Sequence, residues 1–165
     1  MAACLRFTRR VWKNFLDTKG HDAQCFPQLQ IHNATPGYVE TSLKVEQYNT
    51  NRVGTVHGGL VLSLTDTLGS LAVATKGQFM TGVSTDIGTS FVRPAGRVGD
   101  VLYTKTTLTG MGKQLAYTRT DFLDAKGQLV AYGYHTKYIG KSSVHANNVT
   151  LSEDGERVLE GEDLD

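Results

Sequence analysis

The feature that most constrains the fold is the stretch 56–74, which is apolar on nearly every side when drawn as a helix. Its apolar residues are Leu60, Val61, Leu62, Leu64, Leu68, Leu71, Ala72 and Val73. A helix of this kind is buried, because it has no polar face to turn toward water. It is not a membrane span, because these nineteen residues include His57 and Asp66. The rest of the chain must therefore cover this helix.

Asp66 is the residue of this stretch that requires an explanation. On the helical projection, Leu62, Gly69 and Val73 lie within roughly 60° of it, so its carboxylate shares an apolar face. A carboxylate there costs several kcal/mol unless it is paired or hydrated within a site. Either it belongs to a narrow wet stripe with two nearby serines, or it is a functional group in a cleft.

The segment before the helix carries polar groups that could meet a ligand. Gly58 and Gly59 allow close approach of the backbone, and N–H groups at a helix start attract negative charge. His57 is either a general base or a neutral histidine that orients the loop. Asn51 is either an amide donor to a ligand or a turn residue.

Composition excludes several classes of protein. A chain of 165 residues fits one domain on length. Seventeen basic and sixteen acidic residues give no basic excess of the kind that nucleic-acid binding requires. Cys4 and Cys25 are the only cysteines, and no His/Cys cluster accompanies them, so neither a disulfide framework nor a zinc site is predicted.

Six segments have the pattern of strands, and Lys76-Gly77 marks the end of the helix. The strands are expected at Gln28–Asn33, Tyr38–Gln47, Gly82–Val92, Asp100–Thr109, Gln114–Leu123 and Leu129–Ile139. The last four are joined by short connections that contain glycine, which favours antiparallel hairpins. One buried helix with about six antiparallel strands predicts an α+β fold.

The two ends of the chain differ from its middle. Residues 1–20 hold five basic residues against one acid, and Phe7, Val11 and Trp12 recur there at helical spacing. This segment is either a helix that covers one end of the fold or a mitochondrial targeting segment, and both can hold. The segment from Lys141 has few large apolar residues and ends strongly acidic, which predicts a solvated, disordered tail.

Blocks of sequence in a fixed order carry a family resemblance. They are TNRVGTVHGG at 50–59, LxLTD at 62–66, GVSTD at 82–86, RPA at 93–95, GKQLAYT at 112–118 and HTK at 135–137. On these blocks the chain resembles the hotdog-fold acyl-coenzyme A thioesterases, including the bacterial phenylacetate-pathway thioesterases, from about Leu29 to Gly140.

The resemblance implies an antiparallel sheet of about six strands wrapped round one long central helix, with a short N-terminal helix. The segments are then an N-terminal basic helix at 1–27, a hotdog thioesterase domain at 28–140 and the acidic tail at 141–165.

The resemblance also implies a catalytic site shared between two subunits. Its catalytic residues would be Asn51, Gly58, Asp66 and Ser84, supported by His57 and Gly59. Asn51 and Gly58 would hold the thioester carbonyl, and Asp66 of the partner subunit would activate water as a general base or act as a nucleophile. Strict alternation turns Ser84 away from the apolar row of its strand, so a β-bulge or a strand buried on both faces is needed.

Coenzyme A carries phosphates, so basic residues are expected at the mouth of the site. By resemblance the coenzyme A contacts are Asp86, Phe91, Arg93, Pro94, Ala95, Gly112, Lys113, Gln114, Leu115, Lys137 and Tyr138. Solvated surface charge is the commoner fate of such lysines and arginines. Lys113 is the strongest candidate, because a hairpin flanked by glycine can bring backbone donors to a phosphate. The segment GMGKQL is one residue longer than is usual in the family.

The predicted function is hydrolysis of medium- to long-chain acyl-coenzyme A in fatty acid metabolism, without a metal or other cofactor. The protein would be a homodimer or, as a dimer of dimers, a homotetramer, in the mitochondrion or the cytoplasm. Two alternatives stay open: a non-catalytic acyl-coenzyme A binding scaffold, and a hotdog hydratase or dehydratase. The spacing of His57 and Asp66 does not match the hydratase motif.

Overall fold

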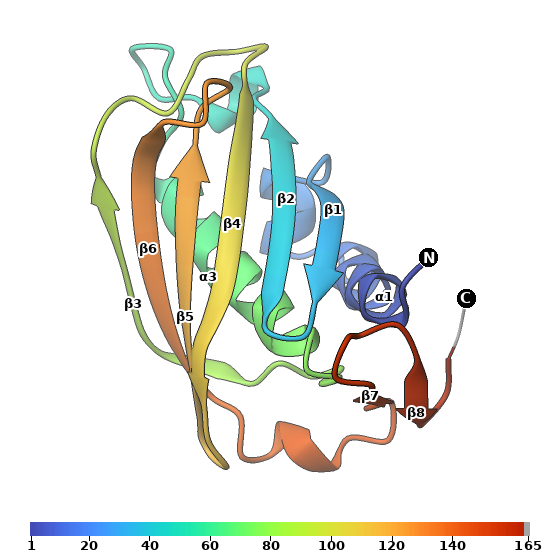
Figure 1. Ribbon diagram of the computed structural model, residues 1–165. Coiled ribbons are helices and arrows are strands. Elements are labelled where there is room, and N and C mark those ends of the chain that lie inside the picture. The colour runs from blue at the N-terminus through green and yellow to red at the C-terminus, as the bar shows by residue number, and fades with distance from the viewer. Residues whose placement is uncertain (164–165) are drawn as a thin grey trace.

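A computed structural model describes residues 1–163. Its centre is the predicted helix, α3 (Gly58–Ala74), which lies against one face of a six-stranded antiparallel sheet (Figure 1). The strands are β1 (Gln30–Thr35), β2 (Tyr38–Lys44), β3 (Val83–Phe91), β4 (Val101–Met111), β5 (Leu115–Leu123) and β6 (Leu129–Tyr138). They are hydrogen-bonded in the order β1-β2-β4-β5-β6-β3. This architecture confirms the predicted α+β fold.

Helix α3 is buried along most of its length, as its composition predicts. Leu64, Leu68 and Leu71 are fully buried in the main core. The helix ends close to the predicted Lys76-Gly77, and Gly77 has a φ of +84°. A Cβ atom at Gly77 would lie 2.0 Å from the Val149 carbonyl oxygen, so this stop requires glycine. No helix within residues 1–163 is long and apolar enough to cross a membrane.

The N-terminal segment forms α1 (Ala3–Asp17) and α2 (His21–Cys25). Phe7, Val11 and Trp12 are buried, and the Trp12 ring stacks on Phe26 with ring centroids 6.1 Å apart. The predicted covering helix is therefore confirmed. Its role as a targeting segment stays a prediction.

The prediction of a disordered acidic tail is wrong for the residues that the structure describes. After β6 the chain forms the 3-10 helix η2 (Ser142–Val144) and then a small hairpin of β7 (Thr150–Leu151) and β8 (Val158–Glu160). The hairpin lies beside the start of α1 (Figure 1), where Cys4 N donates to Gly155 O at 2.8 Å. Arg6 forms a salt bridge with Asp163.

The composition of the tail was misleading because a few apolar residues, Val149, Leu151 and Val158, pack against the core, while backbone hydrogen bonds and charges hold the rest. The basic N-terminal helix supplies the opposite charge, which a composition measured over one segment does not reveal. Residues 164 and 165, the last two of the predicted tail, lie outside the described residues.

The two edges of the sheet differ. At the β1 edge, α1 packs on the strand, and the Arg9 guanidinium donates through Nε and Nη2 to Ile31 O at 3.2 and 2.7 Å. At the other edge, β3 pairs with β6 on one side only, and Val83 and Phe91 are 63% and 60% exposed. The chain therefore closes one edge itself and leaves the other open.

Candidate active site

Three polar side chains from three elements meet beside the open edge. Ser84 Oγ on β3 donates to Asp66 Oδ1 on α3 at 3.3 Å. His135 Nε2 on β6 lies 2.9 Å from Ser84 Oγ and 3.4 Å from Asp66 Oδ1. The structure therefore brings the two predicted catalytic residues Asp66 and Ser84 together, and adds a histidine.

A β-bulge explains how Ser84 reaches this position. In the pairing of β3 with β6, Ser84 lies opposite Lys137 and Asp86 lies opposite Thr136, so Thr85 is the extra residue. Without the bulge, alternation would turn Ser84 away from α3. The bulge is one of the two solutions that the sequence pattern allowed.

Asp66 is less buried than its position on the helical projection suggests. In the single chain its side chain is 52% exposed, while the His135 side chain is fully buried. The carboxylate thus lies at the border between the core and the open side of α3. Water and the Ser84 hydroxyl can solvate it, which avoids the cost of a buried, unpaired charge.

The sequence analysis gave His135 no role, although it stands in the HTK block. Burial, reinforced by the nearby charge of Lys137, lowers the pKa of His135 to about 4, while Asp66 opposes this shift. The imidazole is therefore neutral at neutral pH. Its Nε2–H donates to Ser84 Oγ, and the Ser84 hydroxyl in turn donates to the Asp66 carboxylate. Its Nδ1 is buried without a hydrogen-bond partner. The signal that could have identified it is alternation, since Gly133, His135 and Lys137 share one face of β6.

Close packing of α3 on β6 fixes the position of this histidine. A Cβ atom at Gly69 would lie 2.7 Å from His135 Nδ1, and one at Gly133 would lie 2.4 Å from Thr65 Oγ1. Two glycines on facing elements therefore let the helix and strand approach closely enough for His135 to contact the Asp66 region.

The start of α3 has the features expected of a carbonyl-binding site. His57 is the N-cap, and its Nδ1 accepts a hydrogen bond from Gly59 N at 2.8 Å. This geometry fits a histidine that orients the loop. Gly58 is the first helical residue, where N–H groups lack acceptors within the helix. A Cβ atom on Gly58 would lie 3.3 Å from Phe91 Cζ, so the Phe91 ring flanks this position.

Asn51 organises the loop that leads to α3, after the 3-10 helix η1 (Gln47–Asn49). Its Oδ1 accepts from Val53 N at 3.0 Å and Thr55 N at 3.2 Å, and its Nδ2 donates to Thr55 Oγ1 at 2.9 Å. An amide NH2 group has two N–H donors, so one remains for a ligand. The turn role and the donor role are therefore compatible.

Within one chain, the carbonyl-binding end and the carboxylate are far apart. Gly58 and Asp66 are eight residues apart on α3, which is about 12 Å along a helix axis. One chain cannot bring both groups to the same carbonyl. A site that uses both needs a second copy of the chain.

The predicted coenzyme A contacts lie at opposite ends of the sheet. Phe91 and the Arg93–Ala95 segment are at one end, where Arg93 Nη1 donates to Gln128 Oε1 at 2.7 Å. The β4–β5 hairpin with the exposed Lys113 and Gln114 lies at the other end, near Tyr138. Asp86 is exposed on β3 between the two ends.

Lys137 is not at the mouth of the site, and the expectation that placed it there is wrong. It is 2% exposed, and its Nζ donates to Ser70 Oγ of α3 at 2.8 Å. Burial lowers its pKa, an effect that Asp66 and then Asp22 oppose. Alternation along β6 turns Lys137 inward with His135, whereas both a coenzyme A contact and a solvated surface charge would require it to face outward.

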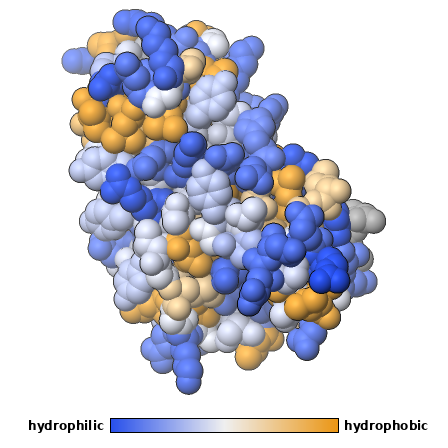
Figure 2. Space-filling view, viewed as in Figure 1, coloured by the Kyte–Doolittle hydropathy of each residue, from blue (hydrophilic) through white to orange (hydrophobic). Residues whose placement is uncertain are grey.

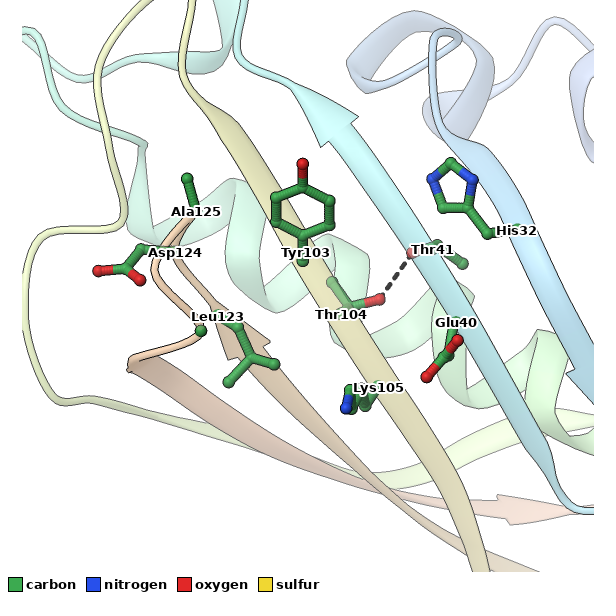
Figure 3. Close-up of a pocket in the computed structure, with 10 residues that line it drawn as sticks. His32, Glu40, Thr41, Tyr103, Thr104, Lys105, Leu123, Asp124 and Ala125 are labelled. Atoms are coloured by element: carbon green, nitrogen blue, oxygen red, sulfur yellow. Dashed lines mark hydrogen bonds between the residues drawn. The ribbon is translucent and has the colours of Figure 1, made fainter.

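Two hollows formed by residues 1–163, among others, are large enough for part of a small molecule. One, of about 460 Å³, adjoins the start of α3 and is lined by His21, Gln24, Cys25, Tyr48, His57, Gly59, Leu60 and Ser63. The other, of about 430 Å³, lies over β2 and β4 and holds none of the predicted site residues; Figure 3 shows Glu40, Tyr103 and Lys105 among its lining. Among residues 1–163, no three His, Cys, Asp or Glu side chains are grouped to hold a metal ion.

Comparison with known proteins agrees with this geometry. The profile of the thioesterase superfamily matches residues 53–131. A Schizosaccharomyces pombe protein described as a candidate esterase is 38% identical over 91% of this chain and 94% of its own length. Human acyl-coenzyme A thioesterase 13 is 37% identical over 68% of this chain and 81% of its own.

A solved structure extends the match to three dimensions. The crystal structure of zebrafish thioesterase superfamily member 2 superposes with a TM-score of 0.76 and 28% identity, over 82% of this chain and 98% of that one. The chain belongs to the thioesterase superfamily and has its hotdog fold.

Proposed function

We propose that the protein is an acyl-coenzyme A thioesterase that hydrolyses medium- to long-chain acyl-coenzyme A to a free fatty acid and coenzyme A. Membership of the superfamily makes thioester hydrolysis the reaction class. The observation that carries the proposal is the Asp66–Ser84–His135 cluster beside an open sheet edge. On the same helix, Gly58 at the first helical position supplies an N–H group for a carbonyl oxygen.

The open edge explains how two copies would complete the site. If the β3 strands of two subunits pair antiparallel, the Phe91 end of one lies beside the Val83 end of the other. These ends are eight residues apart on β3, about 26 Å, so pairing exchanges the two halves of the site. Gly58 of one subunit then faces Asp66 of the partner subunit. Exposed apolar residues near the Phe91 end of β3 support an interface: Val53, Phe91, Val92 and Val98. Figure 2 shows hydrophobic surface gathered at this end, where the loops after β2 and β3 lie.

The same pairing would assemble the coenzyme A site. It brings the Arg93–Ala95 segment of one subunit toward the Gly112–Leu115 hairpin of its partner, although these lie at opposite ends of one chain. Arg93 and Lys113 would then face the phosphates from two sides. Two such dimers would form the proposed tetramer.

In this arrangement, hydrolysis needs removal of a proton from water, attack on the carbonyl carbon, cleavage of the carbon–sulfur bond and protonation of the thiolate. Gly58 N–H and the free Asn51 N–H hold the thioester oxygen, and Asp66 removes a proton from a water that Ser84 orients. The water oxygen bonds to the carbonyl carbon, and charge develops on the held oxygen. The carbon–sulfur bond then breaks, the electron pair leaves with sulfur, and Asp66 returns the proton to the thiolate. Direct attack by Asp66 on the carbonyl is the alternative route, and ¹⁸O incorporation into Asp66 would identify it.

Release of free thiol from acyl-coenzyme A esters of two to eighteen carbons tests this function. We expect turnover with medium and long chains, and sedimentation as a dimer or tetramer at micromolar concentration. Tight binding without thiol release would show the scaffold alternative, and addition of water to an enoyl ester would show a hydratase. Full activity in a sedimenting monomer would exclude the shared site.

We also propose that the protein acts in the mitochondrion, on the basis of the Arg-rich amphipathic α1. Fractionation of cells that express the untagged chain tests this location.

A further inference from the structure

Lys137 is a charged group in the core that the proposed reaction does not use. It is 2% exposed. It lies near the C-terminal end of β6, on the face of the strand that packs against α3. Burying an ammonium group costs free energy unless charges or hydrogen bonds compensate it. Its position therefore requires a partner inside the protein.

The geometry around Lys137 leads to Asp66. Lys137 Nζ donates to Ser70 Oγ at 2.8 Å, and Ser70 Oγ donates to the main-chain oxygen of Asp66 at 3.1 Å. Lys137 also lies directly opposite Ser84 in the β3–β6 pairing. The lysine thus contacts the helical turn that carries Asp66 and neighbours the strand position that carries its hydrogen-bond donor.

The charged and titratable groups around Lys137 come from three elements. Asp66 of α3 is its main opposite charge, Asp22 of α2 is a weaker one, and His135 precedes it by two residues on β6. Asp22 already accepts a hydrogen bond from Thr67 Oγ1. On β5 the residue opposite Lys137 is the buried, apolar Ala116.

We propose that Lys137 is a positioning residue for the reaction proposed above, with its buried ammonium group as the counter-charge of the Asp66 carboxylate. It acts in two ways. Its field favours the ionised carboxylate, which a base must be in order to take a proton from water. The same field disfavours a second positive charge on His135, which keeps that imidazole neutral and able to donate to Ser84.

The first test compares pH profiles of kcat/KM in matched variants. Lys137→Met keeps the length of the side chain and removes its charge. The acid limb of the profile should then move to higher pH, because the variant no longer holds a positive charge near the carboxylate that acts as the base. Lys105→Met removes one charge from the outer face of β4, where Lys105 lies opposite Glu40, and should leave the limb in place. Ser70→Ala removes the hydroxyl partner but keeps the charge, so it should move the limb less than Lys137→Met.

The second test needs no thioesterase activity, so it separates this proposal from the proposed function. NMR titration of the His135 imidazole should show a higher pKa in Lys137→Met than in the wild-type protein. In Asp66→Asn, the Lys137 ammonium group should lose its proton at lower pH than in the wild type, and Asp22→Asn should have a smaller effect.

The outcomes decide the proposal as follows. Shifts of both titrations in the expected directions support it, whether or not thiol release is detected. If Lys137→Met does not fold, the titration of Lys137 in Asp66→Asn decides alone. A Lys137 titration that is the same in Asp66→Asn and wild type overturns the proposal. A folded Lys137→Met protein with an unchanged acid limb and an unchanged His135 titration overturns it as well.

Discussion

The two edges of the sheet are completed in different ways. At the β1 edge, α1 packs on the strand, Arg9 satisfies an outward carbonyl, and the C-terminal hairpin holds the start of the helix. At the β3 edge the strand is open, and the Asp66–Ser84–His135 cluster lies beside it. The covered edge contributes stability, and in the proposed function the open edge carries the chemistry and pairs with the second subunit.

Asp66→Asn tests the open edge with the largest expected effect. The amide has the same shape but cannot take a proton, so turnover should fall by about 1000-fold. The change is at a half-exposed site, so thermal unfolding should move little. Near-wild-type thiol release in this variant would remove Asp66 from the mechanism.

Trp12→Ala tests the covered edge. Trp12 is 6% exposed and stacks on Phe26, and truncating such a side chain costs about 3–5 kcal/mol of unfolding free energy. Chemical denaturation measures the loss. Turnover of the fraction that remains folded should be unchanged, and a large loss of specific activity in that fraction would contradict the division between the edges.

Asn51→Ala tests whether the Asn51 amide donates a hydrogen bond to the thioester carbonyl oxygen at the open edge. Removal of one oxyanion donor usually costs about 100-fold in kcat. Affinity for the substrate should change much less, because the donor matters most once charge develops on the oxygen. Single-turnover rates and binding constants measured on one preparation separate the two effects. Weak binding with unchanged turnover would reduce Asn51 to a turn residue.

His135 predicts how stability at the open edge depends on pH. Its pKa is lowered to about 4 in the fold, from an unfolded value near 6.5. Between these two pH values, the unfolded chain therefore binds more protons than the folded protein does. The contribution of this histidine is fully present above pH ~6.5 and is lost progressively toward pH ~4, at a total of about 3 kcal/mol.

His135→Gln isolates this contribution. Unfolding free energies measured across the same pH range should be less pH-dependent in the variant than in the wild type. Equal slopes in the two proteins would show that His135 already titrates normally in the fold.

Lys113→Ala should have the smallest effect. Binding of acyl-coenzyme A should weaken by about fivefold at low salt, and the difference should shrink as salt rises, because the contact is exposed and screened. A short thioester that lacks the nucleotide is the control substrate, and its KM should not change. Equal losses for both substrates would assign Lys113 a structural role in the hairpin.

The sequence predicted the fold well because its strongest signals are local. The all-round apolar stretch became α3, and alternation with glycine-containing turns placed the six strands within a few residues. The ordered motifs placed Asp66 and Ser84 in one site. The conflict between alternation and the motif at Ser84 was also visible, and a bulge was one of its two expected solutions.

What the sequence missed depends on contacts between distant segments. The acidic tail is ordered because it meets the basic α1, more than a hundred residues earlier in the chain. Lys137 is buried because β6 turns one alternate row of residues toward α3, where Ser70 meets its amine. His135 can lie beside α3 because Gly69, on that helix, leaves room for the imidazole. Alternation along β6 indicates that His135 and Lys137 share one face, but no single segment indicates what that face packs against.

The contact between the first turn of α1 and the C-terminal hairpin has a consequence for the order of events during synthesis. Cys4 leaves the ribosome well before its partner Gly155, because the two lie 151 positions apart in the chain. At 5–20 residues per second, roughly 10–30 s pass before the two can meet. During that interval the basic, amphipathic face of α1 lacks its final covering. The nascent chain therefore exposes an end of α1 that the C-terminal hairpin covers in the finished fold.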